Sequence, residues 1–435
     1  MTDDGIRPST IDTAELRRVA VSSLIGTAME WYDYFVYGIV AALVFDRLFF
    51  PELSPTAGTV AAFLTFGIGF LARPLGAVLF GHLGDRIGRR NTLVATILLI
   101  GISSGAIGLL PTFDSIGIAA PILLAGLRVL QGLSVGGEWG GAVLMAVEHA
   151  PAEKRGFYGA MPQYGSPLGT LGSSGAVALA ALLPDAQFEA WGWRLPFLVS
   201  FVFVVIALYL RLRVSESPIF KQLRNENRAV RLPVAEVFRS SSLRVMFAVA
   251  ACLFASGAFY LLTTYIVNYG TRNLGLSDQV MLIGTVLGAL LEALAIYAGG
   301  RLADTFAPAR VVAAGSALSV VLAFPLMAMV ATAQPLLVIL AVGIAIGLLG
   351  LPFGPLGAMM AQMFPEQARY SAVAIAYNIA GMIGGFVPSI AVAVVAASGG
   401  AIWAVAALLA LIMLISTAGG IGAARVSHHL SAGQA

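Results

Sequence analysis

Long apolar segments without charged residues recur along the chain. Four of them have the length of a single membrane span, for which about 20 apolar residues are needed: 53–72, 91–113, 156–184 and 245–271. Two longer segments, 311–365 and 370–424, are each interrupted near the middle by a turn-like stretch, so each predicts a pair of helices. The pattern therefore predicts an all-α integral membrane protein.

The apolar pattern and the positions of Gly and Pro together predict twelve membrane-spanning helices. The predicted spans are 19–45, 57–80, 91–111, 119–148, 157–183, 195–212, 245–270, 279–300, 310–330, 335–363, 371–397 and 401–423. The first span is too long for a secretory signal and lacks its small-residue cleavage site, so we expect it to remain in the mature chain.

The positions of Lys and Arg predict the orientation in the membrane. With the amino terminus inside, 20 of the 25 fall in cytoplasmic segments or at the cytoplasmic ends of spans, three fall outside and two lie deep within spans. Basic residues are retained on the cytoplasmic side. Both termini are therefore predicted to be cytoplasmic, in a bacterial plasma membrane, and the net charge of +3 needs no nucleic-acid partner.

Composition narrows the possible functions further. The chain is 59% hydrophobic and 11% charged, whereas soluble domains carry about 25% charged residues. The single cysteine, Cys252, excludes an intramolecular disulfide or a cysteine metal cluster. No phosphate-binding glycine loop, nucleophile elbow or metal-ligand cluster appears, so neither an enzyme nor a resident cofactor is predicted.

Two sequence features recur at nearly the same offset. Asp85 and Asp304 are 219 residues apart, and Pro151 and Pro365, each followed four residues later by an arginine, are 214 apart. Such repeats are common in transporters, whose binding site lies between the repeats near the membrane midplane. We therefore predict three parts, a six-helix half at 1–212, a cytoplasmic linker at 213–244 and a second six-helix half at 245–435.

Several motifs carry a resemblance to a known family. The segments 81–90 and 128–132 resemble the signature loop and the fourth-helix motif of the major facilitator superfamily. Further motifs resemble its metabolite:proton symporter family: Glu30-Trp31-Tyr32-Asp33-Tyr34, Arg73-Pro74-Leu75-Gly76, Gly136-Gly137-Glu138-Trp139-Gly140, Trp191 to Phe197 and Glu216-Ser217-Pro218. The first half is most similar to bacterial shikimate permeases, and less so to α-ketoglutarate and proline/betaine carriers. The resemblance implies import of a small organic acid with protons by alternating access.

Ionisable residues inside predicted spans are candidates for function, because each costs roughly 2.5 to 3.5 kcal/mol in the membrane interior. They are Glu30, Asp33, Arg73, Arg128, Glu138 and Glu292. A carboxylate beside an arginine can alternate between paired and protonated states. We predict that Asp33 and Arg128 couple proton movement, as the resemblance also implies, with Glu30 as a further candidate. The alternative is a permanent Asp33–Arg128 ion pair that only fixes helix packing.

Arg73 and Arg128 are also the candidates for holding a substrate carboxylate, since guanidinium groups bind carboxylates bidentately. Arg73 could instead contact backbone carbonyls at an inner gate. Further candidate substrate-binding residues are Tyr32, Tyr37, Gln131, Gln163, Tyr164, Tyr260, Tyr265, Asn268, Glu292, Tyr377 and Asn378. For each of these, polar packing between helices is the alternative. Glu292 could serve as a second protonation site or as a partner for a substrate cation.

The resemblance implies a gate in the segment after the second span. Its predicted residues are Gly81, Gly84, Asp85, Arg86, Gly88, Arg89 and Arg90, joined by Glu138, Arg155, Asp304 and Arg369. The basic residues could instead only anchor the topology. In the second half the corresponding segment reads Phe306-Ala307-Pro308-Ala309, where Gly-Arg-Arg is common, so we expect a weaker latch there.

Substrate and mode of transport stay open at this point. Shikimate or a related hydroxylated carboxylate is the first expectation, and a dicarboxylate, an aromatic acid or a zwitterionic osmolyte are alternatives. Segment 164–169 has a weak similarity to a motif of drug exporters, which leaves a drug/proton antiporter as a further alternative. A sensor of the same fold would bind but not accumulate its ligand. The expected partners are the substrate, protons and the lipid bilayer, and the expected state is a monomer.

Overall fold

The computed structural model describes residues 13–225, 237, 239 and 241–432. All regular elements in these residues are helical. Ten helical segments among them are long and apolar enough to cross a membrane, and a pair bent by 44°, Ala14–Val40 with Leu43–Phe49, would make an eleventh. The prediction of an all-α, multi-pass membrane protein is confirmed, whereas a count of twelve spans stays a prediction.

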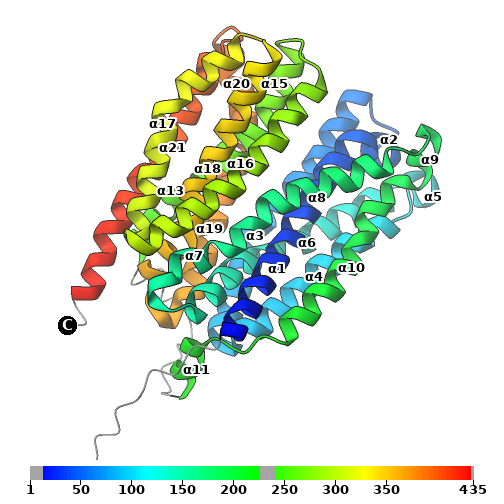
Figure 1. The fold of residues 1–435 in the computed structure, drawn as a ribbon. Helices are drawn as coiled ribbons and strands as arrows, with labels where there is room; N and C mark the ends of the chain where they lie inside the picture. The colour runs from blue at the N-terminus through cyan, green and yellow to red at the C-terminus, as the bar shows by residue number, and fades with distance from the viewer. Residues whose placement is uncertain (1–12, 226–236, 238, 240, 433–435) are drawn as a thin grey trace, which may run out of the picture.

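The helices before residue 213 pack against one another and form what we call the first bundle (Figure 1). Its long helices are α1 (Thr13–Val40), α3 (Pro55–Ile87), α4 (Arg89–Leu109), α6 (Ala119–His149), α8 (Gly165–Ala180) and α10 (Leu195–Leu212). Its short elements are η1 (Ala41–Phe45), α2 (Asp46–Phe49), α5 (Phe113–Ile116), η2 (Ala152–Lys154), α7 (Arg155–Gly159), η3 (Met161–Tyr164), α9 (Asp185–Ala190) and η4 (Gly192–Arg194).

The helices after residue 241 form the second bundle, and α11 (Pro218–Asn225) lies between the two in the chain. The second bundle contains α13 (Ser242–Cys252), η5 (Leu253–Ala255), α14 (Gly257–Tyr260), η6 (Leu261–Tyr265), α15 (Ile266–Arg272), α16 (Asp278–Thr305), α17 (Pro308–Ala331), α18 (Pro335–Met363), η7 (Glu366–Ala368), α19 (Arg369–Gly385), α20 (Val387–Ala397) and α21 (Ile402–Ala432). Part of the predicted linker 213–244, namely 226–236 with 238 and 240, lies outside the described residues.

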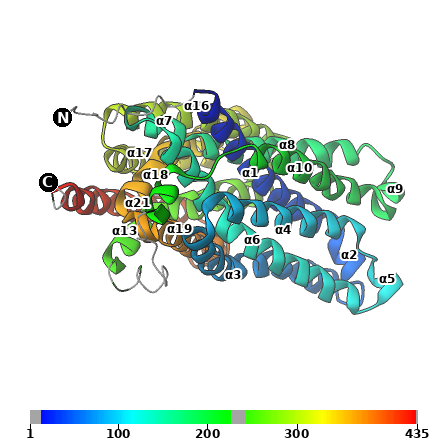
Figure 2. The same cartoon turned by 90° about the horizontal axis from the view of Figure 1, so that it is seen from below.

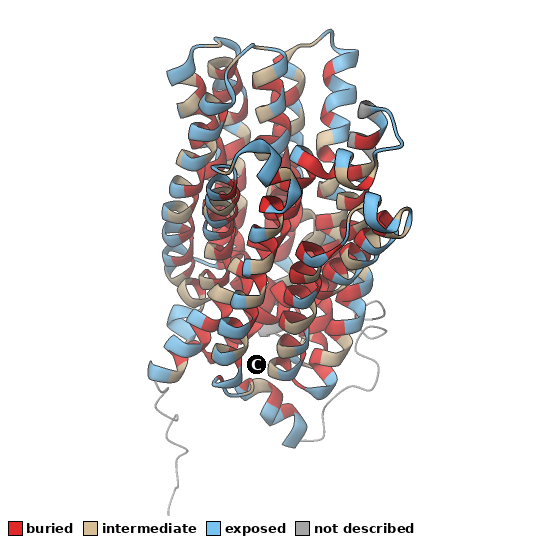
Figure 3. Ribbon diagram, turned by 90° about the vertical axis from the view of Figure 1, so that its right-hand side faces the viewer, coloured by how far each residue is buried: buried red, intermediate tan, exposed pale blue. Residues whose placement is uncertain are grey.

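The start of α1, the helix α11 and the end of α21 lie at one end of the molecule, which we call the linker end (Figures 1 and 2). The two bundles lie against each other at this end and diverge toward the opposite, far end. Buried residues concentrate where helices face one another (Figure 3). Large apolar side chains such as Leu75, Val205 and Leu294 are about two-thirds exposed on the outside, as expected for a surface in contact with lipid.

Two predicted loops are largely helical in the structure. The helix α3 continues through residues 81–87 and ends only at Gly88, whose φ of +115° favours glycine. The helix α16 likewise continues to Thr305. Because no Gly with positive φ or Pro interrupts either segment earlier, the helical hydrogen bonds extend beyond the predicted ends of the spans, so the candidate gate lies mostly on helix.

The predicted span 157–183 is divided in the structure. It begins with α7 and the 3₁₀ turn η3, which contains Pro162, and only then continues as the 16-residue α8. Pro162 cannot donate a backbone hydrogen bond, which favours a break at this point. The predicted span 371–397 is also divided, into α19 and α20, with Pro388 in the first turn of α20.

Candidate functional site

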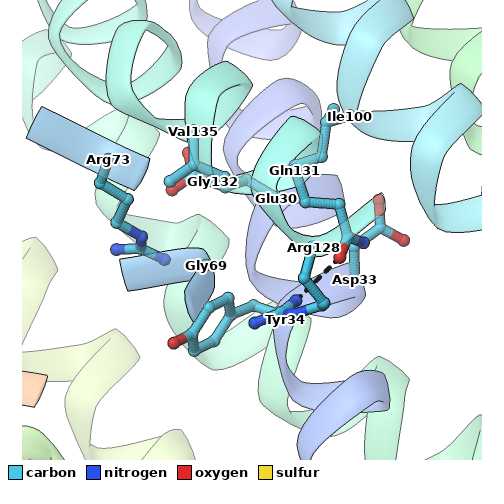
Figure 4. Close-up of a pocket in the computed structure, with 10 residues that line it drawn as sticks. All are labelled: Glu30, Asp33, Tyr34, Gly69, Arg73, Ile100, Arg128, Gln131, Gly132 and Val135. Carbon is cyan, nitrogen blue, oxygen red and sulfur yellow. Dashed lines mark hydrogen bonds between the residues drawn. The ribbon is translucent and has the colours of Figure 1, made fainter. Parts of the chain in front are cut away.

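A small buried cavity lies inside the first bundle (Figure 4). It is lined by Glu30, Asp33 and Tyr34 of α1, Gly69 and Arg73 of α3, Ile100 of α4, and Arg128, Gln131, Gly132 and Val135 of α6. Four of these side chains are ionisable residues that the sequence predicted inside spans. Each of the four is at most 5% exposed, so the structure brings two carboxylates and two guanidinium groups together away from water.

Helix geometry and glycine explain why these groups converge. Glu30 and Asp33 are three residues apart on α1 and therefore share one face. A β-carbon at Gly69 would lie 2.9 Å from Nη2 of Arg128, so the missing side chain leaves room for this guanidinium. A β-carbon at Gly132 would collide with the carbonyl of Gly69. The two glycines thus let α3 and α6 approach closely around Arg128.

Asp33 and Arg128 line the same cavity, but in the described part of the chain no ion pair joins them. Oδ1 of Asp33 accepts a hydrogen bond from the hydroxyl of Ser200, and Oδ2 has no hydrogen-bond partner in the described ranges. Arg128 donates to Oε1 of Gln131 at 2.8 Å and to the carbonyl of Phe66 at 3.1 Å. The permanent Asp33–Arg128 ion pair that was the alternative from the sequence is therefore absent here.

Arg73 is a buried cation that forms no ion pair in the described part of the chain, although the carboxyl group of Glu30 lines the same cavity. Its guanidinium carbon lies 4.6 Å from the ring centre of Tyr34 and 4.8 Å from that of Phe70, which are cation–π distances. Its Nε has no hydrogen-bond partner among the described residues. Its Nη1 would be 3.9 Å from a β-carbon at Gly381 of the second bundle. Arg73 therefore lies where the bundles meet, and Figure 4 shows Tyr34 between it and Arg128.

The other polar candidates of the first bundle make contacts within that bundle. Tyr32 donates to the carbonyl of Pro196 at 2.8 Å, and the Tyr37 hydroxyl lies 2.5 Å from Oγ1 of Thr65. The ring of Tyr37 also faces Arg128, whose guanidinium carbon is 4.0 Å from its centre. These contacts support a packing role for Tyr32 and a supporting role beside the cavity for Tyr37.

Gln163 and Tyr164, two further candidate substrate-binding residues, lie in η3. Gln163 is buried and accepts a hydrogen bond from Nε1 of Trp139 at 2.9 Å. Tyr164 is half-buried and packs against an apolar cluster to which both bundles contribute. Neither residue lines the cavity of Asp33.

Three candidates of the second bundle contact the first bundle. Tyr260 has its ring centre 5.5 Å from that of Phe70, and Tyr377 stacks on Trp139 at 3.7 Å. Asn378 donates to the carbonyl of Gly136 at 2.8 Å. Two others lie apart from these, since Tyr265 packs near Tyr269 with ring centres 6.2 Å apart and Asn268 is exposed. The predicted substrate-binding residues are therefore not gathered in one cavity.

The carboxylates of the candidate gate bind helix ends across the two bundles. Asp85 accepts hydrogen bonds from the backbone N–H groups of Tyr370 at 3.2 Å and Ser371 at 2.8 Å, at the start of α19. Asp304 accepts one from the N–H of Phe157 at 3.0 Å, in α7. The two acceptors, Asp85 and Asp304, are 304 − 85 = 219 positions apart, and the donors Phe157 and Ser371 are 371 − 157 = 214 apart. These are the offsets of the sequence repeat. The second bundle therefore keeps this contact despite its altered segment.

Some of the other candidate gate residues make close contacts, and others do not. Gly81 and Gly84 lie against Ser371 and Tyr370, with no space for a side chain. The backbone N–H groups of Arg89 and Arg90 donate to Glu216, at 3.0 and 3.2 Å from Oε1. By contrast, Arg86 is exposed, and Nε of Arg155 has no hydrogen-bond partner within the described ranges.

Two acidic–basic contacts involve residues that the sequence did not single out. Glu148 lies 3.0 Å from Nε of Arg89 and 3.5 Å from Nη1 of Arg369, and it accepts a hydrogen bond from Ser217. Glu148 ends a span beside His149, where a charge is unremarkable in sequence, so no local signal marked it. The predicted gate residue Glu138 pairs with Arg211 at 2.8 Å, a partner 73 positions away that only the fold reveals.

Comparison with known proteins agrees with this architecture. Residues 23–387 match the profile of the Major Facilitator Superfamily. The chain belongs to this superfamily of membrane transporters and is not an enzyme. Its fold is that of a solved relative described as a proton:xylose symporter, XylE, with a TM-score of 0.71 over 95% of both chains at 17% identity.

Two curated relatives from Escherichia coli K12 are more similar in sequence. The chain is 42% identical to the shikimate transporter over 392 residues, which cover 89% of each protein. It is 39% identical over 373 residues to the inner membrane metabolite transport protein YhjE, covering 84% of this chain and 85% of the relative. The chain is therefore a metabolite-transporter homologue, and its resemblance to the metabolite:proton symporters is confirmed.

Proposed function

We propose that this protein is a proton-coupled symporter that imports a small organic acid, such as shikimate or a related hydroxylated carboxylate, across a bacterial inner membrane. In this proposal the protein has twelve membrane spans in two six-helix halves, residues 1–212 and 245–435, joined by a cytoplasmic linker over 213–244. Both termini are cytoplasmic and the protein works as a monomer. The proton is the coupling ion, and no resident cofactor is involved. The named relatives support the substrate class.

One observation carries the proton-coupling role: Asp33 is 1% exposed, shares a cavity with Arg128, and is not paired with it. Burial disfavours the carboxylate, and a nearby guanidinium favours it. Because both influences act without a fixed ion pair, a small rearrangement of the cavity can load or release the proton. Glu30 lines the same cavity, its Oε2 has no hydrogen-bond partner among the residues that the structure describes, and it can assist this step.

Arg73 is the best-supported anion-binding residue. It is buried at the meeting of the two bundles and carries no anion in the described part of the chain. An unpaired buried guanidinium is costly, and a substrate carboxylate held by two hydrogen bonds would neutralise it. Tyr34, Phe70 and Tyr260 form an aromatic wall around it, suited to a cyclic hydroxylated acid.

The contacts at the linker end support alternating access. Asp85 and Asp304 hold the bundles together there, while the bundles diverge at the far end. With the linker end on the cytoplasmic side, this is an outward-facing arrangement. Import then requires that these contacts open after substrate and proton have bound, in a rocking motion of the two halves.

The experiment is uptake of radiolabelled shikimate into proteoliposomes, with and without an inward proton gradient. We expect accumulation that depends on the gradient and collapses with a protonophore. Asp33→Asn, which cannot ionise, is expected to lose this accumulation but keep exchange of internal for external shikimate. Asp114→Asn, at an exposed carboxylate of the same half, is the matched control and should behave as the unmodified protein.

Each result separates one part of the proposal. Gradient-driven accumulation by Asp33→Asn at the unmodified rate would contradict the coupling role of Asp33. Absence of shikimate uptake by the unmodified protein would contradict the substrate, and a thermal-shift panel of carboxylates and betaines would then identify the class. Outward movement of a solute against an inward proton gradient would contradict symport in favour of antiport.

A further inference from the structure

Glu292 is a buried carboxyl group in the middle of α16, 2% exposed. Its Oε1 accepts a hydrogen bond from the hydroxyl of Ser166 in α8, at 3.1 Å, and its Oε2 has no hydrogen-bond partner in the described ranges. The helices α16 and α8 belong to different bundles and pack against each other. We call this contact region the α16/α8 seam.

Glu292 occupies the position that is equivalent to Arg73 in the repeat. The two residues are 292 − 73 = 219 positions apart, the same separation as Asp85 and Asp304. Each faces a small residue of the opposite bundle: Arg73 faces Gly381 and Glu292 hydrogen-bonds Ser166. The two charged residues therefore lie at equivalent depth in the two contact regions between the bundles.

The seam offers Glu292 no cation. Two of the helices packed against α16, α18 and α8, contain no titratable side chain. On the other elements packed against α16, and on α16 itself, the titratable or charged residues are Tyr164, Tyr158, Arg155, Glu153, Lys154, Arg310, Tyr269, Arg272, Asp278, Tyr297, Arg301 and Asp304. None of them forms a hydrogen bond or an ion pair with Glu292 within the described residues.

We propose that Glu292 is a second proton-binding site, loaded while the α16/α8 seam is closed and exchanging its proton with water when the seam opens. A carboxylate enclosed without a cation is strongly disfavoured, so closure of the seam favours the carboxylic acid. The hydrogen-bond partner of Asp33, Ser200, lies in its own bundle. The partner of Glu292 lies in the opposite bundle, so its surroundings change whenever the bundles move apart.

This site would couple pH directly to conformation, and the inference rests on the alternating-access part of the proposed function. The carboxylate takes its proton from water, and the acid returns it to water, only while the seam is open. Low pH should therefore favour the arrangement described here, with its closed linker end and closed seam. The carboxyl group needs no substrate for this effect, so it can be measured on the unliganded protein.

The experiment measures the distance between spin labels at the far end by pulsed electron paramagnetic resonance. Labels are placed at Leu182→Cys and Leu336→Cys, which are 80% and 67% exposed and lie on different bundles, in a Cys252→Ala background. The full-length protein is studied in detergent or nanodiscs between about pH 5 and about pH 9, a range in which an ordinary exposed glutamate is mostly ionised. Without further substitutions, we expect the population with a long distance between the labels, in which the bundles are apart at the far end, to grow as the pH falls.

Glu292→Gln mimics the protonated acid and is expected to keep the long-distance population at its low-pH fraction throughout. Ser166→Ala, which removes the one hydrogen bond to this carboxyl group, is expected to move the midpoint of the shift. Asp278→Asn, at the exposed start of the same helix, is the matched control and should leave the response unchanged.

An unaltered pH response in Glu292→Gln, or a protein without any pH response, would overturn the proposal. A response lost in Asp33→Asn but kept in Glu292→Gln would overturn it as well and leave the proposed function intact. Conversely, a Glu292-dependent shift in a protein that accumulates no solute would support the site and contradict the transport proposal.

Discussion

Glu138 and Arg211 form an ion pair of the first bundle that is almost completely enclosed by the protein. Their side chains are 1% and 0% exposed, and the carboxylate also accepts a hydrogen bond from Oγ1 of Thr96 at 2.5 Å. A β-carbon at Gly26 would lie within 2.8 Å of both partners, so there is no room for water beside them. Such a pair is costly to break from one side, because the remaining charge stays buried.

We expect Arg211→Met to destabilise the protein strongly, by about 3 to 5 kcal/mol, because it leaves Glu138 buried without its partner. The double variant Glu138→Gln with Arg211→Met should lose less than the single variant, since no charge remains. Thermal unfolding in detergent measures both.

The exposed pair of Arg47 and Glu189 provides the control for this comparison. Its nitrogen and oxygen are 2.5 Å apart, but both side chains are at least 40% exposed. Arg47→Met should therefore change the stability by no more than about 1 kcal/mol. Equal losses in Arg47→Met and Arg211→Met would contradict the interpretation that enclosure decides the effect.

At the scale of elements, the first turns of α7 and α19 depend on carboxylates from the other bundle. The N–H groups at a helix start have no partner within the helix, and a negative charge there is favourable. Asp85 and Asp304 supply that partner across the bundle interface. The same hydrogen bonds therefore stabilise the helix ends and the closed linker end.

Asp85→Asn and Asp304→Asn should each weaken the closed linker end, by about 1 kcal/mol if the loss resembles that of a helix cap. The open population should then rise roughly fivefold. The measurement is the rate at which a membrane-impermeant maleimide labels Ala374→Cys, a buried position between the bundles. Asp114→Asn at the far end is the control, and a labelling rate that stays constant in both gate variants would contradict the latch.

At the scale of the whole molecule, the two bundles approach most closely near the linker end. A β-carbon at Gly140 of α6 would lie 3.4 Å from that of Ala374 in α19, near the separation of about 3.5 to 4.5 Å found in disulfides. The chain has one native cysteine, Cys252, and it is buried. A disulfide at this position would therefore join the bundles selectively.

We expect Gly140→Cys with Ala374→Cys to lose solute uptake when oxidised and to regain it on reduction. The reason is that a covalent link at this depth prevents the linker end from opening. Uptake of radiolabelled shikimate with and without oxidant is the measurement, and the two single-cysteine variants are the controls. Full uptake with the cross-link complete would show that transport does not require this end to open.

The sequence was a good guide to single residues and a poor guide to their partners. The cost of charge in lipid marked Glu30, Asp33, Arg73 and Arg128, and helical spacing placed two of them on one face. Pairing across distant segments left no such signal, so the partners Ser200 and Arg211 appear only in the fold. Helix ends were also mispredicted, because residues 81–87 carry the polar pattern of a loop and yet continue α3.

The two gate contacts are related by the repeat, because each bundle supplies an aspartate to a helix start of the other. Asp85 of the first bundle accepts a hydrogen bond from the start of α19, and Asp304 of the second bundle accepts the equivalent hydrogen bond from α7. A twofold symmetric dimer of one ancestral half would make both bonds automatically, since each subunit offers the same donor and acceptor. Within one chain the two copies need not stay identical, and Arg89 and Arg90 of the first correspond to Pro308 and Ala309 of the second.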